Sequence, residues 1–195
     1  VTVGGTENAV MAASLAAGTS VLRNVARDPE IVDLVRFLKA MGALIEGEGS
    51  DTLTVQGVAT LNGAPYEVMP DRIEVGTYLV AAAATGGSLR VEGICPEVLG
   101  VVRGKLGQAG AHLDEGDDWI SLDMRGERPK AVDIVTEPFP GFPTDMQAQF
   151  SALNTVAQGT SRVTEAVFEN RLMQAHEMKR MGADIVIEGD SACIT

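Results

Sequence analysis

The sequence predicts a mixed α/β (α+β) fold built from three copies of one supersecondary unit. In each copy one glycine closes an alanine-rich run (Gly18, Gly87 and Gly159), and another follows Met or Ala in a turn (Gly42, Gly110 and Gly182). The copies are therefore about 70 residues long, which is too long for common solenoid repeats. Helical and strand patterns alternate within each copy in the order strand, helix, strand, helix, strand, strand (βαβαββ).

In the first copy, residues 1–3 predict a strand, and residues 6–8 predict the cap of a helix at 9–17. That helix is apolar on nearly all sides, so we expect it to be a buried core helix. The elements expected next are a strand at 20–24, an amphipathic helix at 28–41 and a hairpin at 43–55.

The two later copies repeat this order. The second is expected to have helices at 71–84 and 96–106, a strand at 88–92 and a hairpin at 112–122. The third is expected to have helices at 146–157 and 170–181, a strand at 160–164 and a hairpin at 184–194. Prolines in the connector at 137–143 predict a stiff, extended and exposed loop that leads to a helix N-terminus.

Composition limits the classes of function. The 195 residues are 45% hydrophobic but only 4% aromatic, which predicts a core of small aliphatic side chains. A formal charge of −12 argues against a nucleic acid or an anionic membrane as partner. Two cysteines without metal-ligand spacing, and no signal or membrane-spanning segment, predict a cytoplasmic protein. The abrupt strand patterns at both ends predict that the chain is a fragment.

Three motifs resemble one known family. MPDRIEVGT at 69–77, FPTDMQAQF at 142–150 and FENR at 168–171 are similar to the UDP-N-acetylglucosamine enolpyruvyl transferases (UDP-N-acetylglucosamine 1-carboxyvinyltransferases). The resemblance covers the whole chain. It implies two domains with six βαβαββ units in all, each domain an inside-out α/β barrel with helices within and sheets outside. Three of the six units are present: residues 1–68 as the last repeat of the first domain, and residues 69–195 as the first two repeats of the second.

The resemblance also implies an activity. Enzymes of this family transfer the enolpyruvyl group of phosphoenolpyruvate to the 3′-hydroxyl of UDP-N-acetylglucosamine. This is the first committed step of bacterial peptidoglycan synthesis, and so serves cell-wall biogenesis, cell shape and cell division. No metal or organic cofactor is required. The family's Lys-Asn pair, catalytic cysteine loop and later phosphate-binding arginines have no match in this sequence. We therefore expect the isolated chain to be inactive and to act with the remaining repeats of the same enzyme.

By the motif match, Asp145 is the expected catalytic residue, because its carboxylate would accept the proton of the sugar hydroxyl. From the residues alone, the alternative for Asp145 is a helix N-cap. Thr2, Val3 and Gly4 match a segment that contacts the nucleotide sugar. Val167 matches a position whose backbone meets the uridine sugar.

Arg171 is expected either to bind a carboxylate or phosphate of the substrates or to form an internal ion pair. Asp28 and Glu30 align with acids near the reacting groups, although acids are also favoured in a first helical turn. Asp71 and Arg72 are expected to be hinge or interdomain residues whose charges stabilise closure of the cleft between the domains.

Cys95 lies in a loop before a helix, as the family's catalytic cysteine does, but in a different repeat. Its surroundings lack the glycine and arginine of the catalytic loop, so we expect a packing role. Cys193 is expected to be inert. The two histidines, His112 and His176, lie on unrelated elements, and no metal site is expected.

Two alternatives remain at the level of the sequence. One is a noncatalytic scaffold of three repeats, or a module that binds a sugar nucleotide without chemistry. The other is a 3-phosphoshikimate enolpyruvyl transferase, which shares the fold but would not be expected to carry the three motifs.

Overall fold

The computed structural model describes residues 1–195, the whole chain. The chain divides into two compact units, Val1–Met69 and Pro70–Thr195. None of its helices has the length and apolarity that crossing a lipid bilayer requires.

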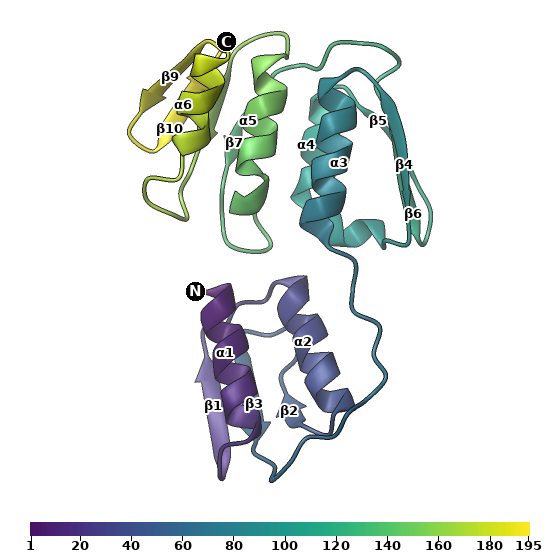
Figure 1. Cartoon of the computed structure of the whole chain (residues 1–195), viewed down its shortest axis with the longest axis vertical. Helices are drawn as coiled ribbons and strands as arrows, with labels where there is room; N and C mark the ends of the chain where they lie inside the picture. The colour runs from purple at the N-terminus through teal and green to yellow at the C-terminus, as the bar shows by residue number, and fades with distance from the viewer. The chain divides into compact units, whose positions relative to one another are not determined.

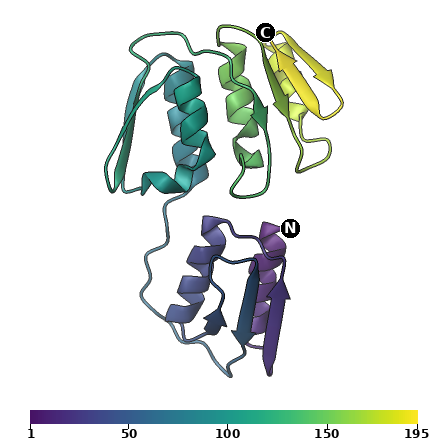
Figure 2. The same cartoon turned by 180° about the vertical axis from the view of Figure 1, so that it is seen from behind.

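In the first unit, two helices lie on one face of a three-stranded antiparallel sheet (Figures 1 and 2). Its elements are α1 (Val3–Ser14), β1 (Thr19–Arg23), α2 (Pro29–Ala40), β2 (Leu44–Glu46) and β3 (Thr52–Gln56). The helix start expected near residue 28 is confirmed, since Asp28 occupies the N-cap position of α2 and Pro29 follows it.

The second unit contains two further copies, which are side by side in Figure 1. The elements of the first of these are α3 (Arg72–Ala84), β4 (Ser88–Glu92), a 3₁₀ turn η1 (Pro96–Leu99), α4 (Val101–Gln108), β5 (His112–Glu115) and β6 (Trp119–Asp123). The other consists of β7 (Ile134–Val135), a 3₁₀ turn η2 (Thr144–Met146), α5 (Gln147–Thr155), β8 (Ser161–Thr164), α6 (Met173–Arg180), β9 (Ile185–Glu188) and β10 (Ser191–Ile194).

One strand order recurs in all three copies: β1-β3-β2, β4-β6-β5 and β8-β10-β9. In each, the last strand of the copy lies in the middle, and both of its pairings are antiparallel. The mixed α/β fold of repeated units is therefore confirmed. That the two units belong to two barrel domains of a larger enzyme stays a prediction.

The strand predicted at the start of every copy is present in the third copy alone, where β7 pairs in parallel with β8. Residues 1–3 form no strand. Instead α1 begins at Val3, and Thr2 is its N-cap, whose Oγ1 accepts a hydrogen bond from Gly5 N at 3.3 Å. The β-branched residues favoured a strand, but threonine is also a good N-cap residue. The caps predicted at 6–8 consequently lie inside the helix.

Helix α1 is only partly buried, contrary to the prediction of a fully enclosed core helix. Val10 and Ser14 are completely buried, but Met11 is 43% and Leu15 is 56% exposed. A single copy supplies one sheet and one other helix, and these cover one side of α1 within the first unit.

A single hydrophobic core joins the two copies of the second unit, with α3 packed against α5. Phe142 and Phe150 are both buried in this core and meet edge to face, with 5.2 Å between their ring centroids. The two ends of the FPTDMQAQF motif are thereby anchored in the core, which fixes the position of the residues between them.

The connector at 137–143 is not extended, so that prediction is wrong. Glu137 N donates to Phe142 O and Gly141 N donates to Pro138 O, both at 2.9 Å, and a parallel bridge joins Thr136 to Phe142. Proline fixes φ but leaves ψ free, so a proline-rich segment can still turn back on itself. The result is a closed loop directly before the turn that carries Asp145.

Asn154 of α5 holds the segment that links the two copies of the second unit. Its side chain is buried, its Oδ1 accepts from Val132 N, and its Nδ2 donates to Val132 O, both at 3.0 Å. Asn154→Ala leaves two buried main-chain groups without partners, so we expect the free energy of unfolding to fall by about 2–3 kcal/mol, measured by urea denaturation. Asn8→Ala removes a solvent-exposed bond to Gly4 O and is the matched control, with an expected loss below about 0.5 kcal/mol. Equal losses in the two variants would show that the Asn154 bonds do not stabilise the link.

Candidate functional site

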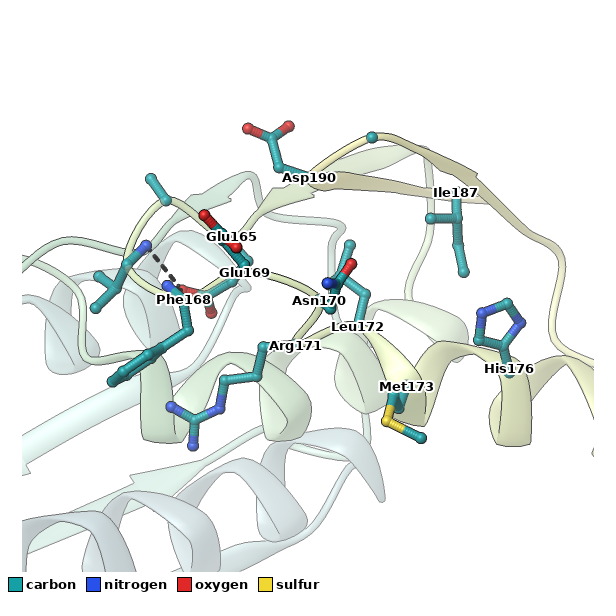
Figure 3. A pocket seen from close by; sticks show the side chains of 13 residues that line it. Glu165, Phe168, Glu169, Asn170, Arg171, Leu172, Met173, His176, Ile187 and Asp190 are labelled. Carbon is teal, nitrogen blue, oxygen red and sulfur yellow. Dashed lines mark hydrogen bonds between the residues drawn. The ribbon is translucent and has the colours of Figure 1, made fainter.

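The candidate site begins where β8 ends. Ser161, Val163 and Glu165 alternate toward the buried side of this strand, so Glu165 enters the interior just beyond its last residue. The following loop, residues 166–172, leads into α6. This loop and the β9–β10 hairpin line an open pocket of about 750 Å³ (Figure 3).

Glu165 organises the floor of the site. It is 3% exposed, and its Oε1 accepts hydrogen bonds from Thr136 Oγ1 (2.8 Å), Val167 N (2.9 Å) and Phe168 N (3.1 Å). Its Oε2 accepts from Thr144 Oγ1 at 2.7 Å. Burial raises the pKa of Glu165, but the hydrogen bonds from the two threonines and the two main-chain N–H groups outweigh it, so the pKa lies below its ordinary value. The side chain is therefore an ionised acceptor at neutral pH.

Arg171 connects this floor to Asp145. Its Nη2 donates to Asp145 Oδ1 at 2.6 Å, and its Nη1 donates to Thr144 Oγ1 at 2.9 Å. The Arg171 guanidinium carbon also lies 5.1 Å from the centroid of the Phe168 ring. Asp145 is in the first turn after Pro143, the N-cap position of η2, and it forms this ion pair rather than standing at the cap. Arg171, for its part, adopts the internal pair that was one of its two expected roles.

Three of the predicted site residues therefore lie in one neighbourhood. Asp145 and Arg171 are in direct contact, and Val167 belongs to the loop that Glu165 holds. The side chains of Asp145 and Arg171 are 58% and 41% exposed, so a ligand can reach them.

The pocket itself carries more negative than positive charge. Its lining includes the exposed carboxylates of Glu169 and Asp190 but only one guanidinium, that of Arg171, which already binds Asp145. Phe168 lies at one end of the pocket and His176 at the other (Figure 3). No group of three or more His, Cys, Asp and Glu side chains is placed to hold a metal ion. The lining suits an uncharged group with hydroxyl or N–H donors better than it suits a phosphate.

The predicted residues Thr2, Val3 and Gly4 belong to the first unit, where they form the exposed N-terminal end of α1. A Cβ on Gly4 would meet nothing within 4 Å, so its main chain is open to approach. Gly5, which was not singled out, is the constrained position, because a Cβ there would lie 2.5 Å from Thr2 Cγ2.

The remaining candidates stand at helix starts. Asp28 and Glu30 begin α2. Asp71 caps α3, since its Oδ1 accepts from two main-chain N–H groups of the first turn at 2.8 and 3.3 Å. The guanidinium of Arg72 lies 5.9 Å from the centroid of the Phe139 ring. Asp71 thus has a structural role, while a role in closing a cleft stays a prediction.

Sequence reasoning missed the residues that hold the site together, namely Glu165, Thr144 and Thr136. A signal for Glu165 was present: the period-two pattern Ser161, Val163, Glu165 places an acid on the inner side at the end of a strand, three residues before the FENR motif begins. The two threonines carry no such signal, because their partners come from distant segments.

Cys95 does not pack in the core as predicted, since its side chain is exposed. The next residue, Pro96, is the one that is buried at this turn. The Cys95 thiol donates to Glu97 Oε2 at 2.7 Å. This hydrogen bond to a carboxylate, with a smaller contribution from burial, raises the pKa of the Cys95 thiol above its ordinary value.

We expect Glu97→Gln to make Cys95 more reactive, because removing the carboxylate charge lowers the thiol pKa and increases the thiolate fraction. In a Cys193→Ser background, the rate of iodoacetamide alkylation at pH 8 should rise by at least about threefold. Glu127→Gln removes an exposed carboxylate elsewhere and should leave the rate unchanged. An unchanged or slower rate in Glu97→Gln would show that Glu97 does not suppress the thiolate.

A family model described as EPSP synthase (3-phosphoshikimate 1-carboxyvinyltransferase) matches residues 1–195. Among solved structures, the chain is similar to the enolpyruvyl transferase NikO from Streptomyces tendae, with a TM-score of 0.86, 24% identity, and coverage of 98% of this chain and 46% of that one. It also matches EPSP synthase from Acinetobacter baumannii, with a TM-score of 0.47, 16% identity, and coverage of 98% and 44%. The chain thus spans less than half the length of these structures, and the likeness to NikO shows the fold that the two chains share.

Proposed function

The chain belongs to the EPSP synthase (3-phosphoshikimate 1-carboxyvinyltransferase) family, and from this premise we propose that it is the central segment of a UDP-N-acetylglucosamine enolpyruvyl transferase. The enzyme would transfer the enolpyruvyl group of phosphoenolpyruvate to the 3′-hydroxyl of UDP-N-acetylglucosamine and release phosphate. Its proposed setting is peptidoglycan synthesis in the bacterial cytoplasm. In this proposal residues 1–68 are the last repeat of the first domain, and residues 69–195 are the first two repeats of the second.

One observation carries the proposal. The FPTDMQAQF and FENR motifs, separated by 17 residues of sequence between Phe150 and Phe168, place Asp145 and Arg171 in contact at 2.6 Å. The second motif also forms the loop that lines the pocket. Three residues singled out by resemblance to one family, Asp145, Val167 and Arg171, therefore lie in one accessible region of the second unit.

The geometry suits acid–base chemistry on a sugar hydroxyl. Asp145 Oδ1 accepts from Arg171, which leaves Oδ2 able to accept the proton of an acceptor hydroxyl as its oxygen attacks phosphoenolpyruvate. The phosphate of phosphoenolpyruvate leaves as the enolpyruvyl ether forms. In this proposal the general acid of the family, a loop cysteine, comes from the remaining repeats of the enzyme. Cys95 does not replace it, because its surroundings lack the glycine and arginine of the catalytic loop.

The acidic lining suits the sugar or nucleoside part of UDP-N-acetylglucosamine better than it suits shikimate 3-phosphate. In this proposal the diphosphate is bound by cations outside this pocket. Shikimate 3-phosphate carries a carboxylate and a phosphate on a small ring, and such a ligand requires several cations close together. The pocket offers Arg171 alone, with Glu169 and Asp190 nearby. A sugar hydroxyl or a nucleoside, by contrast, donates hydrogen bonds that carboxylates and main-chain carbonyls accept. The description of the matching family model names the other acceptor, so both compounds belong in the test.

The test is calorimetric binding to the full-length enzyme that contains this segment. We expect UDP-N-acetylglucosamine to bind and shikimate 3-phosphate not to bind. Asp145→Ala should lower the affinity for UDP-N-acetylglucosamine by about tenfold, the effect of losing a hydrogen bond to a charged group. Asp117→Ala, at the exposed turn of the β5–β6 hairpin, is the matched control. If shikimate 3-phosphate bound and UDP-N-acetylglucosamine did not, the acceptor would be shikimate 3-phosphate. Binding of the sugar nucleotide without turnover would support the noncatalytic module.

A further inference from the structure

Glu165 is nearly inaccessible, and its carboxylate accepts hydrogen bonds from Thr144 of η2 and from the loop after β8. We propose that Glu165 is a positioning residue: its carboxylate orients the Thr144 hydroxyl, which in turn holds the Arg171 guanidinium against Asp145. The role of Asp145 rests on the proposed function. The relay itself is a feature of the fold and can be tested without substrate.

The Glu165 carboxylate accepts hydrogen bonds at both of its oxygens. Four donors reach its two oxygens, from Thr136, Thr144, Val167 and Phe168. These donors come from the segment after β7, from η2 and from the loop after β8. An ionised carboxylate can only accept hydrogen bonds, so each of the four donors must point its hydrogen at Glu165.

The Thr144 hydroxyl has a single hydrogen to donate. Because that hydrogen is donated to Glu165 Oε2 at 2.7 Å, the hydroxyl can offer only lone pairs to its other neighbour. That neighbour is Arg171 Nη1, which donates to Thr144 Oγ1 at 2.9 Å. Glu165 thus fixes the direction of the Thr144 hydrogen, which leaves the lone pairs of the hydroxyl available to Arg171.

The Arg171 guanidinium has a fixed, planar geometry. With Nη1 held by Thr144, the planar group directs Nη2 toward Asp145, 2.6 Å away. An ion pair as exposed as that of Arg171 and Asp145 gains little stability from its charges alone and separates readily. A buried acceptor behind Thr144 provides the restraint that the exposed pair lacks.

The same carboxylate also fixes the neighbouring backbone. Glu165 Oε1 accepts from Val167 N and Phe168 N, which sets the course of the loop at the position matched to the uridine sugar. One buried group therefore aligns both the loop that lines the pocket and the side chain that would take the proton.

The relay is tested by nuclear magnetic resonance on the full-length enzyme with ¹⁵N-labelled arginine side chains. In the wild type, the Arg171 guanidinium N–H signals should show restricted rotation and slow exchange with solvent. Glu165→Gln places an amide donor opposite Thr144, and Thr144→Val removes the hydroxyl. Both variants should speed the Arg171 exchange by at least about tenfold, the effect of losing a charge-assisted hydrogen bond.

Two further variants separate positioning from mere stability. Thr144→Ser keeps the hydroxyl and should restore slow exchange at Arg171. Thr136→Val removes a different donor to Glu165, one that does not contact Arg171, and should lower the thermal stability while leaving the Arg171 exchange within about twofold of the wild type. Unchanged Arg171 exchange in Glu165→Gln, or equal acceleration in Thr136→Val, would overturn the relay.

A second test of the relay is the turnover of the variants. With UDP-N-acetylglucosamine as acceptor, Glu165→Gln should lower kcat by about 10- to 100-fold, as expected for a misplaced catalytic group, and should add little to the loss already caused by Asp145→Asn. Full additivity of the two losses would overturn the relay. If the wild type forms no enolpyruvyl product from this acceptor, the proposed function fails, and the Arg171 exchange still decides whether the relay exists.

Discussion

Asp145→Asn in the full-length enzyme is expected to lower kcat by about 10²- to 10⁴-fold, the usual contribution of a general base. Asparagine preserves an oxygen that accepts from Arg171 Nη2 but cannot take the proton of the acceptor hydroxyl. The fold should remain intact, because the Asp145 side chain is 58% exposed and its ion pair contributes little to stability. Steady-state kinetics with phosphoenolpyruvate and UDP-N-acetylglucosamine measure the effect.

Asp117→Asn is the control for this prediction, since it makes the same chemical change at an exposed position of the β5–β6 hairpin turn. Its kcat should equal that of the wild type. If Asp145→Asn retained at least one third of the wild-type kcat, Asp145 would not be the base. Asp145 would then be an element of the Arg171 ion pair and nothing more.

Phe150→Ala is expected to cause the largest loss of stability, about 3–5 kcal/mol. Phe150 is completely buried in the core shared by both copies of the second unit, and it meets Phe142 edge to face. Truncation removes this contact and leaves a cavity under the segment that carries Asp145. The free energy of unfolding from urea denaturation, followed by circular dichroism, measures the loss.

Two variants are controls for the loss of stability in Phe150→Ala. Phe150→Leu keeps most of the buried volume and should lose less than about 1.5 kcal/mol. Tyr78→Ala truncates an aromatic side chain of α3 that is 59% exposed, and should cost under about 0.5 kcal/mol. A loss in Phe150→Ala no greater than that in Tyr78→Ala would mean that the core does not support the site as described.

The elements predicted well are those whose signals are local. Strand β4 has the predicted bounds, Ser88–Glu92, and α3 ends at Ala84 as predicted because its cap, its apolar run and its closing glycines all lie in the sequence itself. The strand predicted at residues 1–3 is absent because strand formation depends on distant segments as well as on the local sequence. The β-branched side chains of residues 1–3 are compatible with a strand, but a strand needs a neighbour to pair with, and pairing is decided by distant segments.

In the candidate site, too, residues with a local sequence signal could be predicted and residues with distant partners could not. Asp145, Val167 and Arg171 were singled out because each lies in a short motif or directly before one, and their role in substrate binding stays a prediction. The pairing of Asp145 with Arg171 agrees with the internal ion pair that was one alternative for Arg171. The partners of Glu165 could not be predicted. Thr136 and Thr144 lie 29 and 21 residues before Glu165 in the sequence. Only the folding of the connector into a closed loop brings the two threonines to Glu165.

Identification of the product shows which acceptor the enzyme uses. The full-length enzyme is incubated with phosphoenolpyruvate and equal concentrations of UDP-N-acetylglucosamine and shikimate 3-phosphate, and the products are identified by mass spectrometry alongside a phosphate assay. We expect enolpyruvyl-UDP-N-acetylglucosamine and phosphate in equal amounts, with formation of both greatly reduced in Asp145→Asn. Enolpyruvylshikimate phosphate as the product, or no enolpyruvyl product from either acceptor, would contradict this expectation.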